Sequence, residues 1–133
     1  IVGIDRKHTI IIVGAGNIGH ALTNFPGFAE TGFEVKALFD VNEDLIGTEI
    51  KGHPVLDVKD MDEYIRENQI DIGVIAARRS AAQEIADRMC AAGIRGIWNF
   101  VPLDITTSVP IENVHLSESL STLSYKIEHG LLD

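Results

Sequence analysis

The sequence predicts an α/β protein with a Rossmann-type, doubly wound and mostly parallel sheet, followed by a C-terminal helix. Three observations predict this fold class. Apolar, β-branched segments alternate with helical segments along the chain. The first predicted strand runs directly into a turn from Gly14 to Gly19 that fits the pattern G-x-G-x-x-G. The second predicted strand ends in an acid, Asp40, which lies 21 residues after Gly19.

The first half of the chain contains three predicted strands and two predicted helices. The opening segment 9–13 is a continuous β-branched run, which is typical of a strand buried on both faces. The glycine turn leads into a helix that Pro26-Gly27 should end. In order, we expect a strand at 9–13, a helix at 18–24, a strand at 34–40, a loop with a short edge piece at 41–53, a strand at 54–58 and a helix at 61–68.

The second half continues this alternation. Ser80-Ala81-Ala82-Gln83 has the form of a capping box, in which the Ser80 hydroxyl accepts from the Gln83 N–H and the Gln83 side chain reaches back. The helix that begins there is expected to run to Ala92 and to end at Gly93, a suitable C′ residue. The other elements expected are strands at 70–77, 94–101 and 113–116, and a final helix from about Ser117 toward Gly130.

Composition and charge restrict the class of protein. A chain of 133 residues is long enough for one domain and too short for a Rossmann unit plus a substrate domain. Its net charge of −9 opposes the phosphates of DNA, so we expect it to bind nucleic acid poorly by itself. No apolar run would span a membrane and the single Cys90 cannot form an internal disulfide, so a cytoplasmic location is expected. The five His residues lack ligand spacing, and no metal site is expected.

The glycine turn and Asp40 predict a dinucleotide site. Gly14 permits the tight turn, Gly16 lets the backbone approach a pyrophosphate, and Gly19 lets the following helix pack close to the strand. Free N–H groups at the start of that helix would bind the phosphates. Asp40 would accept from the adenosine ribose, and because Val41 rather than Arg or Lys follows it, NAD(H) is favoured over NADP(H). The alternative is a strand-end Asp that only caps the next turn.

Two arginines precede the helix expected at 80–92. Positive charge at a helix N-terminus is unfavourable unless an anion lies near it, so Arg78 or Arg79 could face the pyrophosphate. The alternative is that both arginines are simply solvated.

The final helix carries a single apolar stripe. Its members recur at spacings of three and four residues, and they are Leu116, Leu120, Leu123, Ile127 and Leu131. From the pattern alone, the stripe either covers the sheet of its own chain or packs against a partner chain. The first interpretation is the simpler one.

Several stretches resemble the Rex family of redox-sensing transcriptional repressors. They are GAGNIGHAL, NFPGF, ALFDVNEDLIG, AAQEIADRMCAAGIRGIWNFVP and ENVHLSESLSTLSYKI. The resemblance runs from about Asp5 to Glu128 and is to the C-terminal, NAD(H)-binding domain of the family. It implies a homodimer that binds operator DNA when NAD⁺ is plentiful and releases it when NADH rises. DNA would be bound by an N-terminal winged-helix domain expected to lie outside this chain.

The resemblance also implies which residues bind the cofactor. The glycine turn takes the pyrophosphate, Asp40 takes the ribose, and the ends of two later strands line the nicotinamide side. The residues expected at the site are Gly14, Ala15, Gly16, Asn17, Ile18, Gly19, Asp40, Val41, Ala76, Ala77, Arg78, Asn99 and Phe100. No catalytic residue is expected.

In the family the C-terminal helix is exchanged between protomers, which implies a Rossmann unit at 1–116 and an exchanged helix at 117–133. Two positions depart from the family pattern, because Phe25 stands where a Tyr is usual and His115 where an Asp is usual. Two other functions remain open on the residues alone. One is a CoA-binding domain of the kind found in acyl-CoA ligases, and the other is a small NAD-dependent oxidoreductase domain.

Overall fold

The computed structural model describes residues 7–132, with the side chains of all of them except 29 and 116–118. A seven-stranded sheet in the order β3-β4-β2-β1-β5-β6-β7 forms its centre, and every neighbouring pair is parallel except β3 and β4. The strands are β1 (His8–Val13), β2 (Phe33–Asp40), β3 (Glu49–Ile50), β4 (His53–Asp57), β5 (Ile72–Ile75), β6 (Gly96–Asn99) and β7 (Ile111–Asn113). The predicted doubly wound sheet is confirmed.

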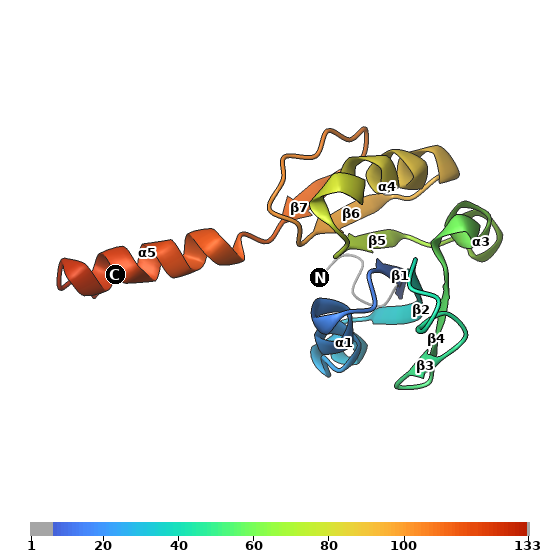
Figure 1. Cartoon of the computed structure of the whole chain (residues 1–133), viewed down its shortest axis with the longest axis horizontal. Helices are drawn as coiled ribbons and strands as arrows, with labels where there is room; N and C mark the ends of the chain where they lie inside the picture. Colours follow the sequence, from blue (N-terminus) through green and yellow to red (C-terminus); the bar gives the residue numbers. More distant parts are fainter. Residues whose placement is uncertain (1–6, 133) are drawn as a thin grey trace.

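Helices lie on both faces of the sheet (Figure 1). The helices are α1 (Asn17–Thr23), α2 (Gly27–Glu30), α3 (Met61–Asn68), α4 (Arg79–Ala92) and α5 (Leu116–Glu128), with a short 3₁₀ turn η1 (Val58–Asp60) before α3. Figure 1 shows α3 and α4 on one side of the sheet and α1 on the other. The helices that follow β1 and β5 therefore cover opposite faces, as a doubly wound fold requires.

The first strand is buried on both faces, as its β-branched run predicts. Ile11 and Val13 join the core under α3 and α4, together with Met61 and Met89. Ile10 joins the core on the opposite face, and Ile12 does so as well. The period of two in a strand divides one apolar run between two cores.

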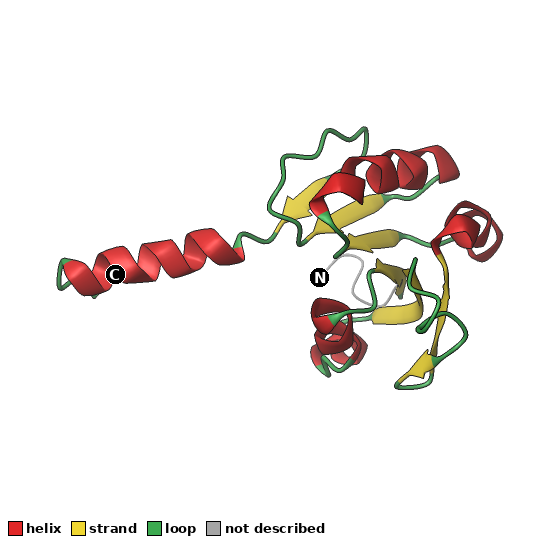
Figure 2. Cartoon of the chain, in the orientation of Figure 1, coloured by secondary structure: helices red, strands yellow, loops and turns green. Residues whose placement is uncertain are grey.

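The predicted capping box at the start of α4 is wrong. The helix begins at Arg79, its N-cap is Arg78, two residues before Ser80, and no side chain caps it. Gln83 instead binds the loop between β6 and β7: its Nε2 donates to the Thr106 carbonyl at 2.8 Å and its Oε1 accepts from the Thr106 N–H at 3.0 Å. Figure 2 shows this loop running beside α4. A tertiary partner therefore competes successfully with the local cap.

Other boundaries shift by a few residues. The helix after the glycine turn ends at Thr23, and a further short helix, α2, follows Pro26. The strand expected at 94–101 is only four residues long, and the strand expected at 113–116 lies at Ile111–Asn113. The predicted C′ position of α4 is confirmed, because Gly93 has φ of 98°.

The last helix does not cover the sheet of its own chain. Figure 1 shows α5 projecting away from the sheet and its covering helices. Three side chains of the predicted stripe, Leu120, Leu123 and Ile127, are 67%, 56% and 71% exposed. The side chain of Leu116, also assigned to the stripe, lies outside the described residues. The interpretation of a helix packed on its own sheet is therefore wrong for the residues described. In that part of the chain, no helix has the length and apolarity to span a membrane.

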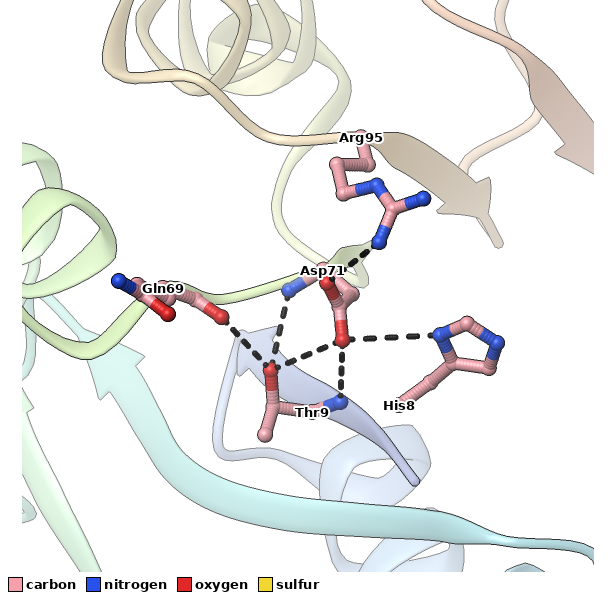
Figure 3. A network of polar contacts seen from close by, with 5 residues as sticks. All are labelled: His8, Thr9, Gln69, Asp71 and Arg95. Carbon is pink, nitrogen blue, oxygen red and sulfur yellow. Dashed lines mark hydrogen bonds and ion pairs between the residues drawn. The ribbon is translucent and has the colours of Figure 1, made fainter. Parts of the chain in front are cut away.

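A polar network ties together the amino ends of β1, β5 and β6 (Figure 3). Asp71 Oδ2 accepts from the Thr9 N–H at 3.0 Å and lies 3.6 Å from His8 Nδ1. Asp71 Oδ1 accepts from Arg95 Nη1 at 3.2 Å. Partial burial raises the pKa of Asp71. The Thr9 hydrogen bond and the nearby charges of Arg95 and His8 lower it by a larger amount, so the pKa lies below its ordinary value.

The variant Asp71→Asn should lower the free energy of unfolding by about 1–3 kcal/mol at pH 7, because Asn cannot accept at both positions. A carboxylate with a depressed pKa stabilises the fold above its unfolded pKa, and the effect is lost as pH falls through the folded pKa. The difference in the free energy of unfolding between wild type and variant should therefore shrink as the pH is lowered from 7 to about 3. Urea denaturation at both pH values measures it, and an equal difference at both would contradict the assignment.

Candidate functional site

A cleft of about 620 Å³ lies at the carboxyl edge of the sheet, where β1, β2, β4 and β5 end. We call it the strand-end cleft. It is bordered by the turn after β1, the end of β2, the turn after β4, the end of β5 and one face of α4. Its lining residues are Val13, Gly14, Gly16, Phe39, Asp40, Val41, Val58, Ala76, Ala77, Arg78, Ala81, Glu84, Ile85 and Arg88.

The structure brings seven of the thirteen expected cofactor-binding residues to this cleft. They are Gly14, Gly16, Asp40, Val41, Ala76, Ala77 and Arg78. The other six are not among its lining residues, and they are Ala15, Asn17, Ile18, Gly19, Asn99 and Phe100. The roles of all thirteen toward a cofactor stay predictions.

Two glycines of the turn are required by the protein itself. Gly14 has φ of 117°, and a Cβ there would lie 2.5 Å from the carbonyl oxygen of Ala76. A Cβ at Gly19 would overlap the carbonyl oxygen of Gly14. These two positions let the turn approach β5 and let α1 pack against the turn.

Gly16 differs from the other two glycines. A Cβ added there would meet no atom of the described chain within 4 Å, and the residue lines the strand-end cleft. It is the N-cap of α1, whose first turn receives no side-chain cap. The fold therefore does not need a glycine at this position, whereas a ligand that approaches the backbone does.

Asp40 connects the two turns that border the cleft. Its Oδ2 accepts from the Ala15 N–H at 2.8 Å, and its Oδ1 accepts from the N–H groups of Val41 and Asn42 at 2.8 and 2.9 Å. Asp40 thus caps the next turn, as the alternative interpretation expects. It also accepts a hydrogen bond from the glycine turn. An ionised carboxylate has about four acceptor positions, so three hydrogen bonds leave room for a ligand hydroxyl.

Only one of the two arginines at the start of α4 lines the strand-end cleft. Arg78 lines the strand-end cleft, but Arg79 does not, and both side chains are exposed. The first turn of α4 contains no acid, so the unfavourable positive charge at this helix start has no local counterion. Of the two, Arg78 is the one placed to meet a ligand anion.

Asn99 has a structural environment. It is 1% exposed, its Nδ2 donates to Asn113 Oδ1 at 2.9 Å and to the Val101 carbonyl at 3.0 Å, and its Oδ1 accepts from the Val101 N–H at 2.9 Å. Phe100 is half-buried and contacts Trp98 edge-on, with ring centroids 4.7 Å apart. Asn99 therefore joins β6 to β7 and to the loop between them.

Sequence reasoning missed seven lining residues. They are Val13, Phe39, Val58, Ala81, Glu84, Ile85 and Arg88. The last four follow one face of α4 at helical spacing, and this face can be recognised only once α4 is known to border the carboxyl edge of β5. Val58 follows β4, whose position beside β2 is a property of the topology.

A second hollow, of about 780 Å³, lies beside α2 and the strands β5, β6 and β7. We call it the aromatic groove, because Phe25, Phe28, Phe33 and Trp98 line it. Phe25 is 53% exposed, and among the described residues of the lining Glu112 alone is charged. Within residues 7–132, no three side chains of His, Cys, Asp or Glu gather where they could hold a metal ion.

Comparison with known protein families identifies relatives of this chain. The profile of the CoA binding domain family matches residues 5–103. The chain belongs to that family. The chain is 47% identical over 132 residues to the redox-sensing transcriptional repressor Rex of Clostridioides difficile (strain 630), covering 98% of the chain and 63% of that relative. The resemblance to Rex repressors is thus confirmed, and the chain spans less than two thirds of the curated relative.

Solved structures support the same relationship. The chain superposes with a TM-score of 0.91 on the crystal structure of RSP in complex with β-NADH, at 43% identity over 97% of the chain and 64% of that structure. It superposes with a TM-score of 0.92 on RSP in complex with β-NAD⁺ and operator DNA, at 43% identity over 97% of the chain and 60% of that structure. RSP is a Rex-family repressor.

Proposed function

We propose that this chain is the NAD(H)-binding sensor domain of a redox-responsive transcriptional repressor, acting in the cytoplasm. The observation that carries the proposal is the strand-end cleft, where Gly14, Gly16 and Asp40 meet in the arrangement that a dinucleotide needs. Relatives at 43% identity that bind NADH and NAD⁺ support it.

The direction of the response follows from the relatives. RSP is found with β-NAD⁺ in its complex with operator DNA, and it also forms a complex with β-NADH. We infer that NADH releases the DNA. The chain has a net charge of −9, so operator binding would need a DNA-binding domain beyond this segment. We assign no catalytic residue to the chain.

We also propose that the chain forms a homodimer in which α5 is exchanged between protomers, with the Rossmann unit at 1–116 and the exchanged segment at 117–133. The exposed stripe on α5 and the aromatic groove are both apolar surfaces that water would otherwise cover. In this arrangement the stripe of one protomer packs into the aromatic groove of the other, so that each apolar surface gains an apolar partner.

CoA is the second candidate ligand, because the family that matches residues 5–103 is named for it. CoA carries a 3′-phosphate on the adenosine ribose, which the Asp40 carboxylate would repel. The cleft therefore favours NAD(H) over CoA.

A calorimetric titration of the chain with NADH, NAD⁺, NADPH and CoA tests the proposal. We expect one NADH to bind per chain, and NADPH and CoA to bind at least tenfold more weakly, because their ribose phosphates lie beside Asp40. Tighter binding of CoA than of NADH would contradict it.

The variant Gly16→Ala should fold normally and bind NADH about tenfold more weakly, because the added methyl group enters only the cleft. Gly19→Ala is the matched control: its methyl group overlaps the Gly14 carbonyl, so it should lower the melting temperature even without ligand. Thermal melts and NADH titration of both variants measure the two effects. If Gly16→Ala binds NADH like wild type, the pyrophosphate does not lie against Gly16.

A further inference from the structure

We propose that Arg88 binds the adenine base of the dinucleotide, and that Asp62 holds the Arg88 guanidinium in position to do so. The proposal deepens the function proposed above and rests on it, because it takes an adenine dinucleotide to occupy the strand-end cleft. It is carried by the position of Arg88 and by the way its guanidinium is held.

Arg88 reaches from α4 to the segment that follows β4. Its Nη2 donates to Asp62 Oδ1 at 2.6 Å and to the Val58 carbonyl at 2.7 Å, and its Nε donates to the same Asp62 oxygen at 2.9 Å. The side chains of Arg88 and Asp62 are 25% and 31% exposed. The guanidinium is thus fixed at the border of the cleft by a carboxylate and a backbone carbonyl.

These contacts use one edge of the guanidinium and leave the other available. A guanidinium has five N–H donors, and the contacts to Asp62 and Val58 occupy those on Nε and Nη2. Within the described part of the chain, Nη1 has no hydrogen-bond partner. Adenine presents ring nitrogens that accept hydrogen bonds, and a guanidinium also stacks on flat rings.

The order of strands places Arg88 at the correct end of the cleft. The glycine turn follows β1, Asp40 ends β2, and Val58 follows β4, and these three strands are successive neighbours in the sheet. Two strand spacings separate β1 from β4, which is roughly 10 Å. If the pyrophosphate lies at the glycine turn and the ribose at Asp40, the base extends toward Val58 and Arg88.

The residues that line this end of the strand-end cleft favour an adenine base over a phosphate. Val41, Val58 and Ile85 line the cleft here with apolar side chains, and Arg88 is already paired with Asp62. A flat, uncharged ring gains from such walls, whereas a phosphate needs unpaired positive charge.

The test compares Arg88→Met, Arg88→Lys, Asp62→Asn and the double variant Arg88→Met/Asp62→Asn with wild type. The control is Arg95→Met, which breaks the other Arg–Asp pair at the opposite edge of the sheet. The ligands are NADH and ADP-ribose, which lacks nicotinamide, each titrated at 50 mM and 500 mM salt. Thermal melts without ligand show whether each variant folds.

We expect Arg88→Met and Arg88→Lys to lower the affinity for both ligands by about tenfold, and Asp62→Asn to lower it by about threefold. The double variant should bind no more weakly than Arg88→Met, because Asp62 acts through Arg88. The loss should persist at high salt, and Arg95→Met should bind normally.

Three results would overturn the inference while leaving the proposed function intact. They are unchanged NADH affinity in a folded Arg88→Met, additive losses in the double variant, and a loss that disappears at 500 mM salt and so indicates a phosphate contact. Failure of wild type to bind NADH would instead overturn the proposed function itself, and this inference with it.

Discussion

The variant Asp40→Ala should bind NADH about ten- to a hundredfold more weakly than wild type, because a hydrogen bond to a charged acceptor contributes about 1.5–3 kcal/mol. The same change should reduce the preference for NADH over NADPH, since the carboxylate that repels a 2′-phosphate is removed. Titration of both ligands into wild type and variant measures both effects.

Asp40 also holds the Ala15 N–H, so its loss could disturb the glycine turn without any ribose contact. A comparison of ADP with 2′-deoxy-ADP separates the two causes. If Asp40 binds the ribose hydroxyl, removing that hydroxyl weakens binding to wild type and not to Asp40→Ala. Equal losses in both proteins would contradict the contact.

Asp57→Ala provides a matched control for this experiment. Asp57 ends β4 as Asp40 ends β2, the two residues are paired across the strands, and Asp57 caps its turn by accepting from the Lys59 N–H at 3.0 Å. It does not line the strand-end cleft. Its removal should lower stability slightly and leave NADH affinity close to that of wild type.

Deleting the chain from Ser117 onward should convert a dimer into a monomer. Burial of a Leu side chain contributes about 1.5–3 kcal/mol, so the stripe on α5 from both protomers can exceed the cost of association. Light scattering should give twice the 14.5 kDa of one chain for the intact protein and a single-chain mass for the shortened one. A monomeric intact chain at micromolar concentration would contradict the exchange of α5.

Substitutions locate the contact within α5 without removing the helix. The triple variant Leu120→Ser, Leu123→Ser and Ile127→Ser should be monomeric, because these three side chains are the most exposed described members of the stripe. Leu132→Ser is the control, since Leu132 is fully exposed and lies outside the stripe. A monomeric Leu132→Ser or a dimeric triple variant would place the dimer contact elsewhere.

The sequence predicts the architecture well, because its signals are local. A β-branched run long enough for both faces of a sheet, followed by glycines at fixed spacing, leaves few alternatives to a parallel strand and a turn. The left-handed conformation of Gly93 follows from the same kind of local rule. Where a signal needed only its own neighbours, as at α3, the predicted boundaries match the structure.

Predictions that depended on distant partners were less successful. The capping box failed because Gln83 is drawn to Thr106, 23 residues further along the chain. The apolar stripe on α5 could not reveal its partner, since an amphipathic helix has the same pattern whether it covers its own sheet or another chain.

The residues of the candidate site fall into the same two groups, those with a local sequence signal and those that depend on distant partners. The glycines and Asp40 follow a known spacing, so a single sequence suffices to select them. Arg88 and Val58 carry no such signal, because they meet only through the placement of α4 beside the segment after β4. Asn99 was selected through the family resemblance, and its surroundings are those of a buried hydrogen-bonding centre.

A crystal structure of the chain with NADH tests the central claim most directly. We expect the dinucleotide in the strand-end cleft, with its pyrophosphate against Gly16, its adenosine ribose within hydrogen-bond distance of Asp40 and its adenine beside Arg88. Density for NADH outside this cleft, or in the cleft with the ribose away from Asp40, would contradict the claim.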